Sequence, residues 1–257
     1  MQNTMAAYEL MIKTSHSLIR GVEFSDAEKA NIVQQLRAGR MTDGRKRTAN
    51  PFAYPKFYIP PHNNGKKLQP VVPISPKTNT TADNAYEFEI LRLLYLFHSP
   101  TDEAISEEVR QMIAGTLNRL RHTCFGYESC HDADCFEAGL MVLRFLSFAA
   151  THDANWIKRR IAVYNNHFAD HRRHSGVQKY YWLILSDLPF DLAEPEIIRQ
   201  KEIIVDHMKR SYTTKKGNGD ILLCIMRNAL ARLPEYSYMK DRKPYEKRGR
   251  LLFDMEP

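Results

Sequence analysis

Apolar residues recur every three or four positions along much of this chain, a pattern that predicts amphipathic helices. The stretch 5–20 has its apolar residues roughly on one side: Tyr8, Met11, Ile12 and Leu18. Gly21 follows where a helix C-cap is expected. Ser25 and Glu28 have the spacing of a capping box, which predicts that a second helix begins there. We therefore expect an N-terminal helical hairpin over residues 1–39.

The pattern changes over residues 40–81, where proline is frequent. Seven of the thirteen prolines fall between Pro51 and Pro76. Proline has no amide donor, so neither a long helix nor a central strand is expected. The segment also carries apolar residues that favour burial: Phe52, Tyr54, Phe57, Tyr58, Ile59, Val71, Val72 and Ile74. We expect an extended arm packed on the body. It either wraps the fold structurally, or lines a groove or docks a partner.

Residues 82–257 read as a helical body, within one domain overall. Asp83 is the expected N-cap of its first helix, and Asp191 with Glu194 has the spacing of a capping box that begins a later helix. Strongly apolar helices begin near Tyr86, Cys135, Val177 and Gly219, at intervals of about 40 to 50 residues, and a more amphipathic helix follows each of the first three. Stacked helix pairs bury a core that one pair cannot. The predicted fold class is all-α, with stacked antiparallel helix pairs of HEAT or armadillo type. An irregular helical bundle and a closed α/α-toroid are the alternatives.

Three of the four cysteines lie in the stretch RHTCFGYESCHDADCF, residues 121–136. A zinc site needs four soft or borderline donors, and the candidate ligands are Cys124, Cys130, His131 and Cys135. The spacings C-x5-C and C-x4-C lack the paired short knuckles of common zinc motifs. The first interpretation is therefore a connection between two helices, with a metal site as the alternative.

A reactive thiol is a further alternative for Cys135. The residue falls in the first turn of a predicted helix, and a helix N-terminus favours the thiolate. Its acidic neighbours oppose thiolate formation: Asp132, Asp134 and Glu137. The pattern alone does not choose between these effects.

Basic residues gather along residues 156–199. The candidate nucleic-acid or polyanion ligands are Trp156, Lys158, Arg159, Arg160, Arg172, Arg173, Lys179 and Arg199. If helix pairs stack, these cations could form a stripe that contacts phosphates while aromatic rings stack on bases. The segments NWIKRR and VQKYYWLI resemble two stretches of the HEAT-like DNA alkylation-repair glycosylases, which pair Trp-x-x-Arg-Arg with a later Val-Gln-Lys and tryptophan. That resemblance implies a helix-repeat fold and DNA binding, although the two stretches lie closer together here.

Histidines provide a second candidate site, in NNHFADHRRHSG. His167 and His171 are four residues apart and would share one helix face. The tripeptide Asn165-Asn166-His167 resembles the Asn-Asn-His of some helical-toroid alginate lyases, which implies a partner tyrosine such as Tyr180 or Tyr181. A helical enzyme centred on His167 is therefore an alternative function.

Charge and composition narrow the remaining choices. The formal net charge is +7, which attracts polyanions but also serves solubility. No apolar stretch approaches 18 residues and no secretory signal is present, so we expect no membrane insertion. Unevenly spaced cysteines favour a reducing compartment, the cytoplasm. The leading hypothesis is a non-enzymatic scaffold or binding module without a cofactor, which recognises a protein or polyanionic partner; nucleic-acid binding is the runner-up.

Overall fold

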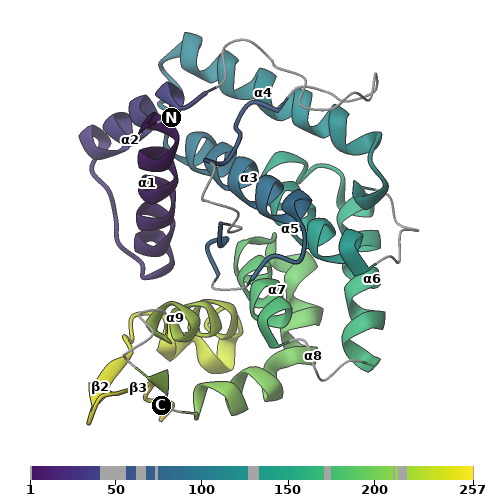
Figure 1. The fold of residues 1–257 in the computed structure, drawn as a ribbon. Helices are drawn as coiled ribbons and strands as arrows, with labels where there is room; N and C mark the ends of the chain where they lie inside the picture. The colour runs from purple at the N-terminus through teal and green to yellow at the C-terminus, as the bar shows by residue number, and fades with distance from the viewer. Residues whose placement is uncertain are drawn as a thin grey trace. The chain divides into compact units, whose positions relative to one another are not determined.

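The computed structural model describes residues 2–40, 56–61, 68–72, 75–126, 133–170, 175–210, 212–213 and 219–256. Within these ranges the chain is mostly helical, which confirms the expected all-α class (Figure 1). No helix in these ranges has both the length and the apolarity that crossing a bilayer requires.

The secondary-structure elements follow one another as a series of helices with a small sheet near the C-terminus. The elements are α1 (Gln2–Ile19), α2 (Asp26–Ala38), α3 (Asn79–Phe97), α4 (Glu103–Arg121), η1 (Cys124–Gly126), α5 (Ala133–Ala149), α6 (Ala154–Asp170), α7 (Ser175–Asp187), α8 (Phe190–Met208), β1 (Tyr212–Thr213), α9 (Gly219–Leu230), η3 (Pro234–Met239), β2 (Tyr245–Lys247) and β3 (Arg250–Leu252). The strands pair antiparallel in the order β1-β3-β2.

Two of the local signals in the N-terminal hairpin are confirmed. Ser25 caps α2, accepting from the amide of Glu28 while the Glu28 carboxylate accepts from the amide of Ser25. Gly21 follows α1 with a φ of 82°, in the left-handed region that favours glycine.

Two expected helix starts are wrong. Thr78, not Asp83, caps α3, because its hydroxyl accepts from the amide of Thr81 and the helix begins a turn earlier. The α8 helix begins at Phe190, without a side-chain cap from Asp191. Pro195 therefore lies inside that helix, past its first turn.

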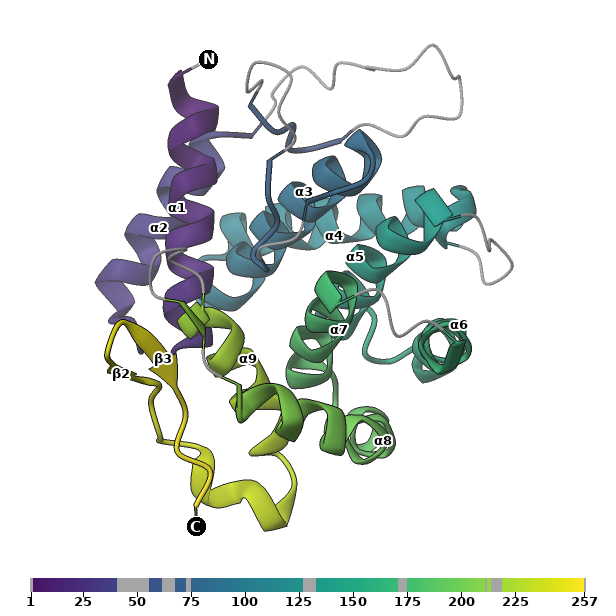
Figure 2. The ribbon, with the colours of Figure 1, turned by 60° about the horizontal axis from the view of Figure 1, so that its bottom comes forward.

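The chain divides into two compact units. Unit 1 comprises Met1–Ser15, Glu23–Val71 and Ser75–Ala150, and unit 2 comprises His16–Val22, Val72–Ile74 and Thr151–Pro257. In unit 1, α3 packs most extensively against α5, and the rings of Phe88 and Phe145 lie 4.8 Å apart between centroids. The two helices run side by side in Figures 1 and 2.

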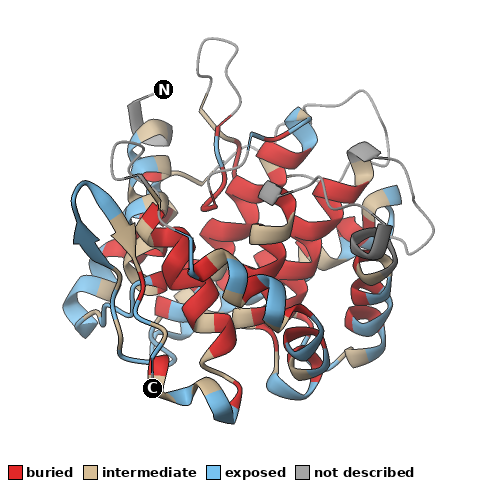
Figure 3. Ribbon diagram, turned by 90° about the horizontal axis from the view of Figure 1, so that it is seen from below, coloured by how far each residue is buried: buried red, intermediate tan, exposed pale blue. Residues whose placement is uncertain are grey.

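Helices α7 and α9 form the main helix contact of unit 2. Their buried side chains include Tyr181, Trp182 and Leu223, each with no exposed surface. Figure 3, coloured by burial, shows helices that are mostly buried and others that are largely exposed. The end of α1 also belongs to this unit. The backbone oxygen of Ile19 accepts from Arg227 Nη2 at 3.2 Å and from Asn228 Nδ2 at 2.9 Å.

The described parts of the proline-rich segment contact unit 1. Lys56 Nζ lies 2.9 Å from Asp83 Oδ2, and the amide of Phe57 donates to Glu87 Oε1 at 2.7 Å. Tyr58 follows with no exposed surface. Residues 41–55 and 62–67 lie outside the described residues.

Buried ion pairs join the helices of unit 1. Arg119 of α4 donates to Glu87 of α3, and Arg144 of α5 donates to Glu89 of α3. Glu89 also accepts from the hydroxyl of Ser15 at 2.5 Å. Each carboxylate is buried among several donors. These pairs therefore fix the positions of the helices of unit 1 relative to one another.

Candidate binding site

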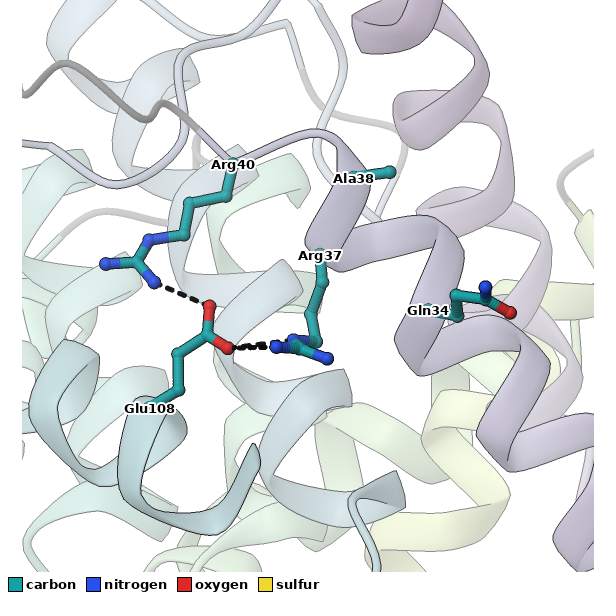
Figure 4. A pocket seen from close by; sticks show the side chains of 5 residues that line it. All are labelled: Gln34, Arg37, Ala38, Arg40 and Glu108. Atoms are coloured by element: carbon teal, nitrogen blue, oxygen red, sulfur yellow. Dashed lines mark hydrogen bonds and ion pairs between the residues drawn. The ribbon is translucent and has the colours of Figure 1, made fainter. Parts of the chain in front are cut away.

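A shallow pocket of about 470 Å³ opens on unit 1, where the end of α2 approaches the start of α4. Its lining residues are Gln34, Arg37, Ala38, Arg40 and Glu108 (Figure 4). Four of the five come from seven consecutive positions of the chain. The pocket is therefore largely built by one helix end and one facing carboxylate.

The sequence of α2 explains why these side chains line a pocket. Ile32, Val33 and Leu36 are buried, so they fix which side of the helix faces the core. Gln34 and Arg37 are three positions apart and thus share a different face. Gly39 ends the helix, and its amide donates to the oxygens of the last turn.

The two arginines converge on one carboxylate. Arg37 donates to Glu108 Oε2 from Nε at 2.8 Å and from Nη2 at 2.5 Å. Arg40 Nη1 donates to the other oxygen, Oε1, at 2.5 Å. Figure 4 shows the two guanidinium groups reaching Glu108 from different directions. About a third of each arginine side chain stays exposed, 35% for Arg37 and 34% for Arg40.

Arg40 has hydrogen-bonding capacity that this carboxylate does not use. Its Nε is buried and has no acceptor among the described residues. The guanidinium carbon lies 5.6 Å from the centre of the Phe57 ring, which holds the group by a cation–π contact. A buried donor without an acceptor is unfavourable, so an acceptor atom from a ligand would be stabilised here.

The charges of the pocket leave a positive excess, because two guanidinium groups face one carboxylate. Burial raises the pKa of Glu108, but the hydrogen bonds and charges of Arg37 and Arg40 outweigh burial, and the net pKa is lowered. The nearby hydroxyl of Tyr58 has no partner among the described residues. Burial, followed by the charge of Glu108, raises the pKa of Tyr58, which stays neutral at physiological pH.

The donors of this pocket are of a kind that suits an anion. Arginine presents a planar array of donors that matches a carboxylate or a phosphate. The lining contains no histidine, cysteine or hydroxyl nucleophile. Among the described residues, no three His, Cys, Asp or Glu side chains gather closely enough to hold a metal ion.

The structure exposes some of the predicted polyanion ligands and buries others. On α6, Lys158 and Arg159 are exposed, whereas Trp156 and Arg160 are 8% and 2% exposed. Trp156 and Arg160 are four residues apart and interleave with Ile157 and Ile161 on the buried face. That spacing is a sequence signal for their burial.

The other predicted cations lie on the following helices. Lys179 of α7 is half-buried, and Arg199 of α8 is exposed, 3.6 Å from Glu196. Arg172 and Arg173 lie outside the described residues. Lys158 and Arg159 thus lie on α6, Lys179 on α7 and Arg199 on α8.

Cationic side chains that the sequence reasoning did not group together lie around Lys179. Burial and then the charge of Arg210 lower the pKa of Lys179. Burial, Arg210 and Lys179 lower the pKa of His207, and Asp206 partly opposes them. The His207 ring meets Trp182 edge-on at 5.3 Å. Among the described residues, the charge of Asp206 offsets this repulsion only in part, at His207.

The proposed enzyme site is only partly described. His167 is a residue of α6, and its side chain is not among those described. Tyr181 is fully buried, with its hydroxyl 3.3 Å from Glu196 Oε2 and 3.4 Å from Asn165 Oδ1. Asn165 Nδ2 donates to Glu196 Oε1 at 2.8 Å. Burial and then Glu196 raise the pKa of Tyr181, so this network acts as a polar part of the core.

The cysteine stretch brings two sulfur atoms together. Cys124 is exposed in η1, Cys135 is half-buried in α5, and their Sγ atoms lie 3.4 Å apart. Cys130 and His131, the other candidate metal ligands, lie outside the described residues.

Comparison of this chain with protein-family models, with curated proteins and with solved structures finds no match. Function must therefore be argued from the geometry of the sites themselves.

Proposed function

We propose that this protein is a non-enzymatic binding module whose arginine pocket takes a carboxylate from an acidic segment of a protein partner. The observation that carries the proposal is the pair Arg37 and Arg40, which already bind one carboxylate, that of Glu108. Both arginines remain partly exposed, and Arg40 Nε has no acceptor among the described residues. An incoming carboxylate would share or replace Glu108 and use the remaining donors.

The proposed framework is a set of stacked helix pairs of HEAT or armadillo type in the cytoplasm. The packing of α3 on α5 within unit 1, and of α7 on α9 within unit 2, supports it. In each case the first helix of one pair meets the first helix of the next. In such folds the second helices and inserted segments remain available to partners.

The pocket is tested with a fluorescein-labelled glutamate decapeptide and fluorescence anisotropy at low salt. We expect saturable binding that weakens as sodium chloride is added. The double variant R37Q/R40Q removes the charge-assisted hydrogen bonds and should weaken binding about tenfold or more. E108Q removes the competing carboxylate and should strengthen binding.

The matched control is R110Q on α4. Arg110 is 71% exposed and pairs with Glu107 at the surface, so the variant removes one positive charge outside the pocket, against two in R37Q/R40Q. Its affinity should stay within about twofold of the unaltered protein. If R110Q weakens binding as much as R37Q/R40Q, the peptide is held by net charge alone and the pocket proposal fails.

A second candidate function, nucleic-acid binding, is supported by the cations around Lys179. Lys179, His207 and Arg210 repel one another, Asp206 offsets that repulsion only in part, and a phosphate would relieve it further. Retention on heparin should fall in K179Q/R210Q and stay nearly unchanged in R37Q/R40Q. If R37Q/R40Q lost retention on heparin and K179Q/R210Q kept it, the polyanion would bind at the arginine pocket instead.

A further inference from the structure

The sulfur atoms of Cys124 and Cys135 lie close together beside the start of α5. Cys124 belongs to the short turn η1 after α4, and Cys135 lies in the first turn of α5. The turn packs against α5, and the two Sγ atoms are 3.4 Å apart. The approach lies wholly within unit 1.

We propose that Cys124 and Cys135 form a dithiol site that a low-molecular-weight disulfide, of the oxidised glutathione class, converts reversibly into an intramolecular disulfide. The site is independent of the arginine pocket and of the binding function proposed for it.

The geometry favours exchange between these two thiols. A disulfide bond is about 2.05 Å long, so the sulfur atoms must move together by little more than an ångström. Both residues lie near the surface of unit 1, with Cys124 exposed and Cys135 half-buried. Side-chain rotation can supply such a movement, because Cys124 is exposed and Cys135 is only half-buried.

The difference in exposure assigns an order to the two steps. Cys124, the exposed thiol, loses its proton to solvent and attacks one sulfur of oxidised glutathione. This forms a mixed disulfide and releases one reduced glutathione. Cys135 then attacks Cys124 Sγ, which closes the intramolecular bond and releases the second glutathione. Two protein thiols are oxidised, and one glutathione disulfide is reduced to two thiols.

The surroundings of Cys135 suit the second, intramolecular step. The positive end of the α5 dipole favours the thiolate that attacks. Glu137, one of the acidic neighbours, is buried and accepts the amide of Lys77 at 2.9 Å. The Glu137 carboxylate is thus stabilised by a hydrogen bond from the Lys77 amide. No third His, Cys, Asp or Glu side chain joins the two sulfurs within the described residues.

The remaining cysteines determine the design of the test. Cys130 lies outside the described residues and between the pair in sequence, so the experiment uses C130S. Cys224 is 2% exposed, and burial raises the pKa of its thiol, so it should stay reduced in the folded protein.

The full-length C130S protein is incubated with oxidised glutathione, and the thiols are then counted and the intact mass measured. We expect two thiols to disappear and no glutathione to stay attached. Cleavage after Glu128 should leave peptides that carry Cys124 and Cys135 joined until a reductant is added. In C130S/C135S, the second step is blocked and Cys124 should retain one glutathione. C130S/C224S should behave as C130S does.

Two results would overturn the proposal. One is a C130S protein that keeps both thiols, or that only accumulates glutathione on Cys124. The other is stoichiometric zinc in the purified protein that is lost in C124S, which would make the sulfurs metal ligands. If C130S does not fold, peptide mapping of the oxidised unaltered protein still decides whether Cys124 and Cys135 are joined.

Discussion

The carboxylate of Glu87 accepts hydrogen bonds from the guanidinium group of Arg119, and the two side chains are 0% and 8% exposed. The pair joins α3 to α4 inside unit 1. Glu87 also accepts the amide of Phe57, so one buried charge holds two helices and part of the proline-rich segment.

Removing one partner of this pair should destabilise the fold strongly. In R119M the charge of Glu87 stays buried without its guanidinium, and we expect the free energy of unfolding to fall by about 3–5 kcal/mol. Urea denaturation followed by circular dichroism measures the change. R110M on the same helix breaks an exposed pair and should lower stability by less than about 1 kcal/mol. Equal losses in the two variants would contradict a buried role for Arg119.

The Glu108 carboxylate should make stability depend on pH. Its folded pKa is lowered below the ordinary value of 4.5, so the ionised form stabilises the folded state. That contribution is complete above the unfolded pKa and is lost as the pH falls through the folded pKa. The melting temperature of E108Q should therefore lie below that of the unaltered protein at pH 7, and the two should converge below about pH 4.5. If the difference in melting temperature between the two proteins grew as the pH fell, the predicted direction of the pH dependence would be wrong.

His207 should report on its cationic neighbours. Burial lowers the pKa of His207 most. Arg210 and Lys179 lower it further, and Asp206 raises it. R210Q removes a positive charge, so the protonated imidazole is less disfavoured and the pKa of His207 should rise. Proton NMR titration of the ring measures this directly. K209Q provides the comparison, and a rise as large in K209Q as in R210Q would rule out a specific effect of Arg210.

Gly126 should not tolerate a side chain. A Cβ built there would lie 2.0 Å from the backbone oxygen of Leu120, a contact that only a backbone shift can relieve. G126A should therefore lower the free energy of unfolding by more than about 1 kcal/mol, as thermal or urea unfolding would detect. At Gly39 the nearest atom is the Ala7 methyl at 3.2 Å, so G39A should have a smaller effect. The reverse order would show that η1 can rearrange.

Signals that act within one turn of helix were readable from the sequence. The Ser25–Glu28 box and Gly21 depend on neighbours three or four residues away, and both were predicted. The same reasoning failed at Asp83, because Thr78 offers a competing hydroxyl one turn earlier and Lys56 takes the carboxylate of Asp83 instead.

The candidate sites depend on pairs that are distant in the chain. Arg37 and Glu108 are 71 positions apart, and nothing near either residue specifies the other. Similarly, the three cysteines of 121–136 suggested ligands, but only the fold selects Cys124 and Cys135 as neighbours. Helical periodicity can assign a side chain to a face, as with Arg160, yet it cannot say which helix that face meets.

The last turn of α1 is stabilised by residues that lie far towards the C-terminus and are therefore synthesised later. The oxygen of Ile19 accepts from Arg227 and Asn228, and Arg20 pairs with Asp220 at 2.7 Å. On the ribosome, a chain that has just released α1 must add some two hundred further residues before these donors exist. Unit 2 therefore closes only after α9 has left the exit tunnel, which makes its assembly a late step for the growing chain.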